Sequence, residues 1–324
     1  MAPAVIEVRD LRTYLYTRWG TVKAVDGLSF SVSAGETLGL VGESGSGKSM
    51  TCLSIMRLVP RPAARIVAGS VLLDGEDLVG KSEREMQRIR GRKLAMILQD
   101  PMSSLNPVFS VGMQVREAVA MYHGLRGRAL WERAAALLAL VRIPSPELRL
   151  RAFPHQLSGG MRQRVVGAMA IAAPPRLLIA DEPTTSLDLT IQAQYLRLLK
   201  ELQERHDLAM IFVTHNLGIV SRMCDRVAVM YAGRIVETGS VRQIFKAPEH
   251  PYTRALLESI PRLGAKLDRL TAIDGQPPDL AKLPAGCAFA PRCPQVMDRC
   301  RSEEPPEVVV GEGRTMRCWL GVPG

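Results

Sequence analysis

The sequence contains no uninterrupted apolar run near the roughly 18 residues that a membrane-spanning helix requires. Its N-terminal segment, 1–10, mixes acidic and basic side chains and lacks the apolar core of a secretion signal. Internal repeats and low-complexity tracts are also absent. These absences argue against an integral membrane protein and a secreted one, so we expect a chain that stays in the cytoplasm.

Aromatic residues make up only 5% of the chain, and acidic residues are outnumbered, which gives a formal net charge of +10. A basic balance can mark contact with nucleic acid or an anionic membrane. Here the bases are scattered, with one local excess at 81–93 where aromatics are few. We therefore expect a solvated or membrane-proximal face and no nucleic-acid partner.

Cysteine is scarce but unevenly placed, because four of the six cysteines fall in the last 38 residues. These four are Cys287, Cys293, Cys300 and Cys318. Disulfides are disfavoured in a reducing cytoplasm, and the spacing C-x5-C-x6-C-x17-C lacks the C-x2-C pairs of most zinc sites. Four thiolates in a loop-rich tail suit an iron–sulfur cluster, [4Fe-4S] in type. Zinc ligation and free thiols stay open as alternatives.

The hydrophobic pattern predicts an α/β fold. Segments 5–8 and 28–32 alternate like half-solvated antiparallel strands, whereas 38–41 is continuously apolar like a buried parallel strand and leads into a predicted helix at 49–58. A helical insertion is expected at about 107–160, with helical spacing at 115–123 and through Leu130, Trp131, Ala135, Leu138 and Val141. The other predicted elements are strands at 71–73, 94–98, 177–180 and 210–213, helices from about 82 and at 190–206, and a hairpin of 227–230 with 234–237.

Residues 42–49 form the sequence Gly-Glu-Ser-Gly-Ser-Gly-Lys-Ser between a predicted strand and a predicted helix, which is the context that a phosphate-binding loop requires. Glycines let backbone N–H groups turn toward the phosphates, and the helix N-terminus adds partial positive charge. Lys48 is expected to reach the β- and γ-phosphates, and the Ser49 hydroxyl is expected to ligate Mg²⁺. The predicted phosphate-binding residues are Gly42, Ser44, Gly45, Gly47, Lys48 and Ser49.

Polar residues follow three of the other buried strands. Asp181 and Glu182 end one strand, where the first carboxylate can hold Mg²⁺ through water and the second can act as general base. Gln99 ends another and can sense the metal and the attacking water. His215 follows a third, in position to contact the γ-phosphate.

A further segment, 157–164, contains Leu157-Ser158-Gly159-Gly160 and supplies a second set of phosphate-binding groups, which indicates a nucleotide shared between two subunits. Together with the phosphate loop, Gln99, the Asp-Glu pair, Ser186-Leu187-Asp188 and His215, in that family's order, it resembles the nucleotide-binding subunits of ABC transporters. The resemblance covers residues 4 to about 258, and Met161 stands where glutamine is commonest in the family.

The resemblance implies roles for residues that patterns alone do not assign. Ser158, Gly159 and Gly160 would bind the ATP held by a partner's phosphate loop, and Asp188 would help to join the two sites. The family stacks adenine on an aromatic side chain. The aligned residue here is Leu15, so we expect its neighbour Tyr16 to serve, with Tyr14 as the alternative.

Three further segments narrow the resemblance to the dipeptide/oligopeptide importer group, which also includes importers of nickel and other small solutes. They are 99–107, 247–253 and the cysteine segment that begins at Gly286. The implied architecture is an ABC cassette at 1–261, with a parallel core sheet, an antiparallel β subdomain and a helical subdomain, followed by a small irregular cysteine-rich domain at 262–324.

This resemblance implies an ATPase that energises import of di- or oligopeptides or related solutes at the cytoplasmic face of the inner membrane. The implied partners are a second, non-identical ATPase subunit, two transmembrane permease subunits and an extracytoplasmic solute-binding protein. A soluble ABC ATPase of translation or DNA maintenance is one alternative, and a non-hydrolysing regulatory cassette is another. The intact Lys48, Asp181, Glu182 and His215 argue against the regulatory cassette.

Overall fold

The computed structural model describes residues 3–100, 104–185, 187–260 and 273–322. Within them the chain forms two compact units. The first holds the described parts of Met1–Val5, Ser33–Glu36 and Lys81–Ile211, and the second those of Ile6–Val32, Thr37–Gly80 and Phe212–Gly324. The expected domain boundary between residues 261 and 262 lies outside the described residues.

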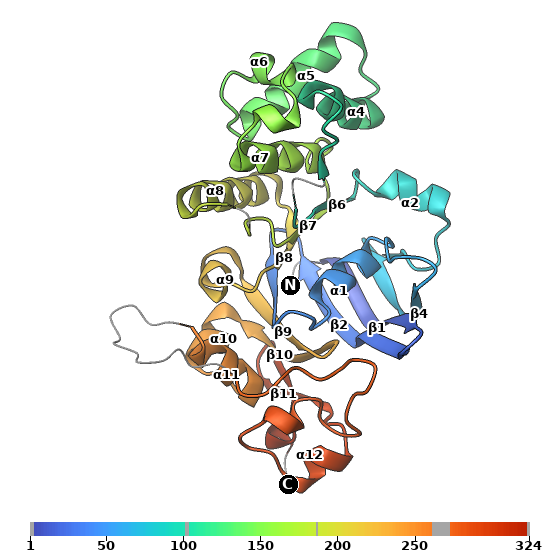
Figure 1. The fold of residues 1–324 in the computed structure, drawn as a ribbon, viewed down its shortest axis with the longest axis vertical. Coiled ribbons are helices and arrows are strands. Elements are labelled where there is room, and N and C mark those ends of the chain that lie inside the picture. The colour runs from blue at the N-terminus through green and yellow to red at the C-terminus, as the bar shows by residue number, and fades with distance from the viewer. Residues whose placement is uncertain (1–2, 101–103, 186, 261–272, 323–324) are drawn as a thin grey trace. The chain divides into compact units, whose positions relative to one another are not determined.

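The first unit is mainly helical (Figure 1). Its helices are α2 (Glu83–Ile89), α4 (Val111–His123), α5 (Gly127–Leu140), α6 (Pro146–Leu150), α7 (Gly159–Ala170) and α8 (Leu189–His206), with the 3-10 turn η1 (Pro154–Gln156). Its strands are β6 (Leu94–Ile97) and β7 (Leu177–Asp181), and β8 (Ala209–Val213) belongs to it up to Ile211.

Helices α4 to α7 pack against one another, which confirms that the stretch expected to be helical is so. Helix α4 starts where the Ser110 hydroxyl accepts a hydrogen bond from the Met113 N–H, and it ends at Gly124, which has a positive φ of 61°. The predicted apolar face of α5 was partly wrong. Trp131 is 37% exposed, and the Arg116 guanidinium lies 4.3 Å above its ring, while Ala134 occupies the buried position.

Strands β6 and β7 pair in parallel, with Leu94 opposite Leu177 and Ile97 opposite Ala180. Every residue of β7 is buried. A strand covered on both faces reads as an unbroken apolar run, which is why these two strands were predictable. Their carboxyl ends bring Gln99 and the Asp181-Glu182 pair to one edge.

The second unit holds the remaining elements. They are the strands β1 (Ala4–Thr17, from Ile6 on), β2 (Gly20–Ser33), β3 (Thr37–Val41), β4 (Ala64–Leu73), β5 (Glu76–Asp77), β9 (Arg226–Tyr231), β10 (Arg234–Ser240), β11 (Glu307–Gly311) and β12 (Arg314–Arg317), the helices α1 (Lys48–Ile55), α9 (Leu217–Met223), α10 (Val241–Lys246), α11 (Pro251–Glu258) and α12 (Asp298–Ser302), and the 3-10 turns η2 (Ala290–Arg292) and η3 (Trp319–Gly321).

Strand pairing in the second unit is of both kinds. Strands β1 and β4 run antiparallel, as expected for the antiparallel β subdomain, and β3 pairs in parallel with β9, as expected for the core. Strand β10 then runs antiparallel to β9 through a turn at Ala232 and Gly233, whose φ angles are both positive. The core sheet is therefore mixed rather than wholly parallel.

The C-terminal region has more regular structure than its composition predicted. Strands β11 and β12 form a hairpin, and β12 pairs with β10, so this region extends the sheet of the second unit. An aromatic cluster packs it further: the ring of Phe289 lies 5.2 Å from that of Tyr231 and 5.4 Å from that of Tyr252. None of the chain's six cysteines, all of which lie in the described residues, forms a disulfide.

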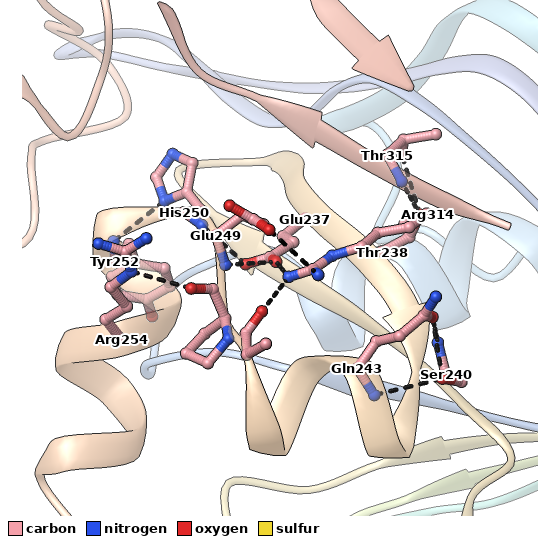
Figure 2. A network of polar contacts seen from close by, with 12 residues as sticks. Glu237, Thr238, Ser240, Gln243, Glu249, His250, Tyr252, Arg254, Arg314 and Thr315 are labelled. Carbon is pink, nitrogen blue, oxygen red and sulfur yellow. Dashed lines mark hydrogen bonds and ion pairs between the residues drawn. The ribbon is translucent and has the colours of Figure 1, made fainter. Parts of the chain in front are cut away.

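A buried ion pair holds this junction together (Figure 2). The Glu237 carboxylate on β10 lies 2.6 Å from the Arg314 guanidinium on β12, and the side chains are 0% and 7% exposed. The same carboxylate accepts hydrogen bonds from the backbone N–H groups of Glu249 (2.9 Å) and His250 (3.1 Å). Glu237 therefore joins two strands to the segment that begins α11.

Replacing Glu237 with glutamine should destabilise the fold strongly, because it leaves the buried Arg314 cation with only the longer ion pair, at 3.4 Å, to the partly exposed Glu249 carboxylate. We expect a loss of about 3–5 kcal/mol in the free energy of unfolding, measured by urea denaturation. The matched control is Glu303→Gln, which breaks an exposed pair with Arg299 and should cost at most about 1 kcal/mol. Equal losses in the two variants would contradict the role given to Glu237.

Candidate functional site

The phosphate loop of the second unit leaves β3 at Val41 and enters α1 at Lys48. Gly42, Gly45 and Gly47 have φ angles of 148°, 80° and 104°, which L-residues with side chains rarely adopt. The backbone is crowded at two of them. A Cβ atom on Gly42 would lie 2.2 Å from the Met230 carbonyl oxygen, and one on Gly47 would lie 2.2 Å from that of Ala24.

Lys48 lies across this loop. Its Nζ donates to the carbonyl oxygens of Gly42 and Glu43, both at 2.8 Å, and to the Ser46 hydroxyl at 3.4 Å. The residue is only 6% exposed, so the loop holds its ammonium group in a fixed place. A cation positioned over a turn of backbone N–H groups is an anion-binding arrangement.

The first turn of α1 adds to this arrangement. It contains no acidic residue, so no side chain of that turn neutralises the partial positive charge of the helix N-terminus. Ser49 is exposed in this turn, and Ser44 and Gly45 are exposed at the tip of the loop. The start of α1 and the tip of the loop therefore lie at the protein surface.

The two candidate aromatic side chains differ in their surroundings. The Tyr14 hydroxyl donates to Asp26 at 2.7 Å, and burial raises the pKa of this half-buried phenol. Tyr16 is 49% exposed, with the Arg65 guanidinium 5.8 Å from its ring centroid. Tyr16 is therefore the ring with a face open to a ligand, and its contact with adenine stays a prediction.

The first unit brings the expected base and the expected glutamine together. The Gln99 Nε2 donates to the Glu182 Oε2 at 3.1 Å, and the Thr185 hydroxyl donates to the same oxygen at 3.0 Å. Glu182 has a φ of 45°, a left-handed backbone that is costly for a residue with a side chain and is found at functional positions. Asp181, just before it, is 4% exposed at the end of β7.

Sequence reasoning missed Thr185. Its signal was present, because Thr185 lies three residues after the Asp-Glu pair in a segment that leaves a buried strand. A hydroxyl at that distance can turn back to the carboxylate. The consequence is that the expected base is oriented by two donors rather than by one.

The serine-glycine segment forms the start of α7. The Ser158 hydroxyl accepts a hydrogen bond from the Met161 N–H at 3.3 Å, and Gly159 is exposed with no atom within 4 Å of where a Cβ would lie. Gly160 packs closely, since its Cβ would lie 2.4 Å from the Ile191 side chain of α8. Ser158 and Gly159 lie exposed at the N-terminus of α7, the end of a helix that favours anions.

The remaining expected site residues occupy helix and strand ends. The Asp188 Oδ1 accepts hydrogen bonds from Thr190 and Ile191 and so caps α8, while Ser186 lies outside the described residues. His215 is exposed after β8 in the second unit. The site residues therefore fall into two sets. Gln99, Asp181, Glu182, Asp188 and Ser158 to Gly160 belong to the first unit, and the phosphate loop, Tyr16 and His215 belong to the second.

The four C-terminal thiols share one electrostatic environment. Burial is the main cause that raises the pKa of Cys287 to about 11, and the charges of the other three thiolates raise it further. Burial also raises the pKa values of Cys293 and Cys318. Across the described ranges, no group of three or more histidine, cysteine, aspartate or glutamate side chains is arranged to hold a metal ion.

Two family models match the chain. The ABC transporter model matches residues 25–185, and the model of the oligopeptide/dipeptide transporter C-terminal region matches residues 236–300. None of the helices in the described ranges is both long enough and apolar enough to span a membrane.

Curated relatives match over nearly the whole chain. The oligopeptide transport ATP-binding protein OppD of Bacillus subtilis is 52% identical over 317 residues, which cover 98% of this chain and 88% of the relative. The dipeptide transport ATP-binding protein DppD of the same organism is 48% identical over 316 residues, covering 98% of this chain and 94% of the relative.

Solved structures match the cassette. A dimeric structure of MJ0796, a bacterial ABC transporter cassette, aligns with a TM-score of 0.66 at 26% identity and covers 73% of this chain and 99% of its own. A second dimeric structure of MJ0796, in a post-hydrolysis state bound to ADP and phosphate, aligns with the same TM-score at 25% identity and the same coverage.

Replacing Gly47 with alanine should both strain the loop and force it away from Ala24. We expect it to cost about 2–5 kcal/mol in the free energy of unfolding and to weaken ATP binding, measured by urea denaturation and calorimetry. The matched control is Gly75→Ala, because Gly75 also has a positive φ, 81°, but has nothing within 4 Å of its Cβ position. The control should cost only about 1–2 kcal/mol and leave ATP affinity unchanged. Similar effects in the two variants would refute the steric argument.

Proposed function

This chain belongs to the ATP-binding proteins of ABC transporters, in the oligopeptide/dipeptide group, and from that membership we propose that it energises the uptake of di- or oligopeptides or related small solutes through membrane partners. Its relatives in B. subtilis carry oligopeptide and dipeptide transport in their names. The observation that carries the hydrolytic part of the proposal is the Glu182 carboxylate held by Gln99 and Thr185.

In the proposed reaction Glu182 takes a proton from a water molecule as that water attacks the γ-phosphorus of ATP. The bond between the γ-phosphorus and the oxygen that bridges to the β-phosphate breaks, and the electron pair leaves with ADP. Two hydrogen bonds to one carboxylate oxygen fix the orientation of the base before the water arrives. Lys48 stabilises the charge on the β- and γ-phosphates.

The donor set suits Mg²⁺. The Ser49 hydroxyl, the Gln99 amide oxygen and the Asp181 carboxylate are hard oxygen donors of the kind that this ion prefers. When bound, the ion supplies charge neutralisation on the phosphates. Asp181 is buried at the end of a strand that is covered on both faces, which limits the directions in which its carboxylate can turn.

The serine-glycine segment supports a proposal of a two-subunit site. Ser158 and the exposed first turn of α7 would contact the γ-phosphate of ATP held by a second ATPase subunit, and Asp188 would lie at that junction. Dimeric cassettes among the similar solved structures support this arrangement. We further propose that the partner is a non-identical ATPase chain, and that both work with two permease subunits and an extracytoplasmic solute-binding protein at the cytoplasmic face of the inner membrane.

For the C-terminal cysteines we propose ligation of an iron–sulfur cluster. The support is chemical: four thiols at C-x5-C-x6-C-x17-C lie in one region, and their charges act on one another. The side chains as described form no ready metal site, so the proposal requires the thiols to reorient when the cluster is inserted. The raised pKa values of Cys287, Cys293 and Cys318 make their deprotonation costlier, and binding of the cluster would have to supply that cost.

Replacing Glu182 with glutamine should abolish ATP turnover while leaving ATP binding intact. Glutamine keeps an oxygen that accepts the hydrogen bonds of Gln99 and Thr185 but loses the basicity that the reaction needs. We expect a fall in hydrolysis rate of about 10²–10⁴-fold, with the Kd for ATP unchanged, and loss of peptide uptake by vesicles that contain the chain with its membrane subunits.

The control is Glu132→Gln, which changes a carboxylate that is 62% exposed on α5 and pairs with Arg128, and it should leave turnover unchanged. Turnover that survives Glu182→Gln would refute the assigned base. Vesicles that take up nickel but no peptide would refute the peptide assignment alone. Recovery of the chain with ribosomes or DNA instead of a membrane complex would refute transport.

Anaerobically purified chain should show the broad thiolate-to-iron absorption and contain iron if the cluster proposal holds. Replacing Cys287 and Cys300 together with serine should abolish both signals because it removes two of four ligands. Cys52→Ala, which changes a buried thiol of α1, should keep them. A colourless, iron-free preparation of the unaltered chain would overturn the proposal.

A further inference from the structure

An arginine of the C-terminal region is bound to the phosphate loop of the same unit. Arg292 ends η2, and its guanidinium makes two hydrogen bonds to Glu43: Nη1 to Oε2 at 2.7 Å and Nη2 to Oε1 at 3.0 Å. Glu43 is the residue directly after Gly42, at the start of the loop. The Arg292 side chain is only 3% exposed, and a bidentate pair of this kind is both strong and directional.

The Arg292 guanidinium is itself fixed in place. Its Nε donates to the carbonyl oxygen of Asp274 at 3.0 Å, and its Nη2 also donates to that of Ile273 at 3.3 Å. Its Nη1 donates to the Tyr231 hydroxyl at 3.3 Å. The guanidinium is therefore held by three separate segments: Glu43, Tyr231 and residues 273–274. Its position depends on how the C-terminal region packs.

A second contact acts on the backbone of the same loop residue. The N–H of Glu43 donates to the Tyr252 hydroxyl at 2.9 Å. Tyr252 is fully buried, with its ring 4.6 Å from that of Tyr231 and 5.4 Å from that of Phe289. The aromatic cluster of Tyr231, Tyr252 and Phe289 is thus joined to the phosphate loop by this hydrogen bond.

Glu43 connects these contacts to Lys48. The Lys48 Nζ donates to the Glu43 carbonyl oxygen at 2.8 Å, so the peptide groups on the two sides of the Glu43 Cα bond Tyr252 and Lys48. The Glu43 carboxylate, 25% exposed, puts a negative charge beside a loop built to receive phosphates. The Arg292 cation pairs with that negative charge, which would otherwise repel a polyphosphate bound at the loop.

We propose that Arg292 is a positioning residue of the nucleotide site: it holds and neutralises Glu43, and it thereby couples the packing of the C-terminal region to the affinity of the phosphate loop for ATP. This coupling is reciprocal, because whatever tightens the C-terminal region tightens ATP binding, and ATP in turn protects the C-terminal region. The inference rests on the proposed ATP site and extends it to a segment outside the nucleotide motifs.

The test uses the full chain and ATP with Mg²⁺. Arg292→Met keeps much of the side-chain volume but removes the charge and all five donors. We expect the Kd for ATP, measured by calorimetry, to rise about 5- to 100-fold, within the usual range of coupling between sites. Turnover at saturating ATP should change less than threefold, because the residues that act on the attacking water are untouched.

A double variant separates electrostatic positioning from loss of packing. In Arg292→Met with Glu43→Gln, no uncompensated carboxylate remains, so the ATP affinity should recover to within about threefold of that of Glu43→Gln alone. Arg292→Lys keeps the charge but loses the paired geometry and should fall between the wild type and Arg292→Met. The control is Arg301→Met, at an exposed arginine of α12, which should leave the Kd unchanged.

The reciprocal effect has its own measurement. In the wild type, ATP should slow the amide hydrogen exchange of residues 287–300, and in Arg292→Met this protection should be lost. An unchanged Kd in folded Arg292→Met, or additive effects in the double variant, would overturn the inference. If Arg292→Met does not fold, a wild-type Kd and wild-type protection in Arg292→Lys would overturn it instead. A wild-type chain that binds no ATP would overturn the proposed function as well.

Discussion

A single buried carboxylate, Glu237, joins three segments of the second unit: β10, β12 and the residues that precede α11. It accepts hydrogen bonds from Arg314 on β12 and from two backbone N–H groups that precede α11 (Figure 2). Burying a carboxylate is costly unless every lone pair finds a donor, and here the donors come from separate segments. The Glu237 carboxylate therefore stabilises the pairing of β10 with β12 and the start of α11 together.

The consequence of that constraint reaches the nucleotide loop. Helix α11 carries Tyr252, whose hydroxyl accepts the Glu43 N–H, and the C-terminal region carries Arg292, which binds the Glu43 side chain. Glu237 therefore contacts both the start of the helix that carries Tyr252 and strand β12 of the region that carries Arg292. Stability and ligand affinity share these contacts, so they are expected to change together when the junction is altered.

The elements that were predicted correctly are those whose signal lies in a short, continuous stretch of residues. Strands β3 and β7 contain continuous apolar runs. The three glycines of 42–47 have positive φ angles, and a Cβ atom on Gly42 or Gly47 would clash with a backbone carbonyl oxygen. Gln99 and the Asp181-Glu182 pair were each predicted at the end of a buried strand, and the structure joins Gln99 to Glu182 by a hydrogen bond. Thr185 was missed because its signal is a short spacing from the Asp-Glu pair and not a hydrophobic period.

The parts that were not predicted depend on contacts between distant residues. The C-terminal hairpin of β11 and β12 is stabilised by pairing with β10, some 77 residues away for Thr238 and Thr315, and proline and glycine in the region masked it. Trp131 fits the apolar spacing of α5 but is 37% exposed. The Arg116 guanidinium lies over its ring, and this cation–π contact stabilises the ring where packing in the core does not. Periodicity reports which faces are apolar, and the tertiary structure decides which of them are covered.

Glu43 connects the phosphate loop to the C-terminal region through its ion pair with Arg292. Two like charges about 4 Å apart repel by about 1 kcal/mol in water and about 4 kcal/mol near a protein surface, so a carboxylate beside a phosphate site weakens binding unless a cation offsets it. Here the offsetting cation comes from 249 residues further along the chain. A loop that contains Glu43 is therefore suited to ATP only in a chain whose C-terminal region is folded against it, and that dependence links the two matched family regions in one molecule.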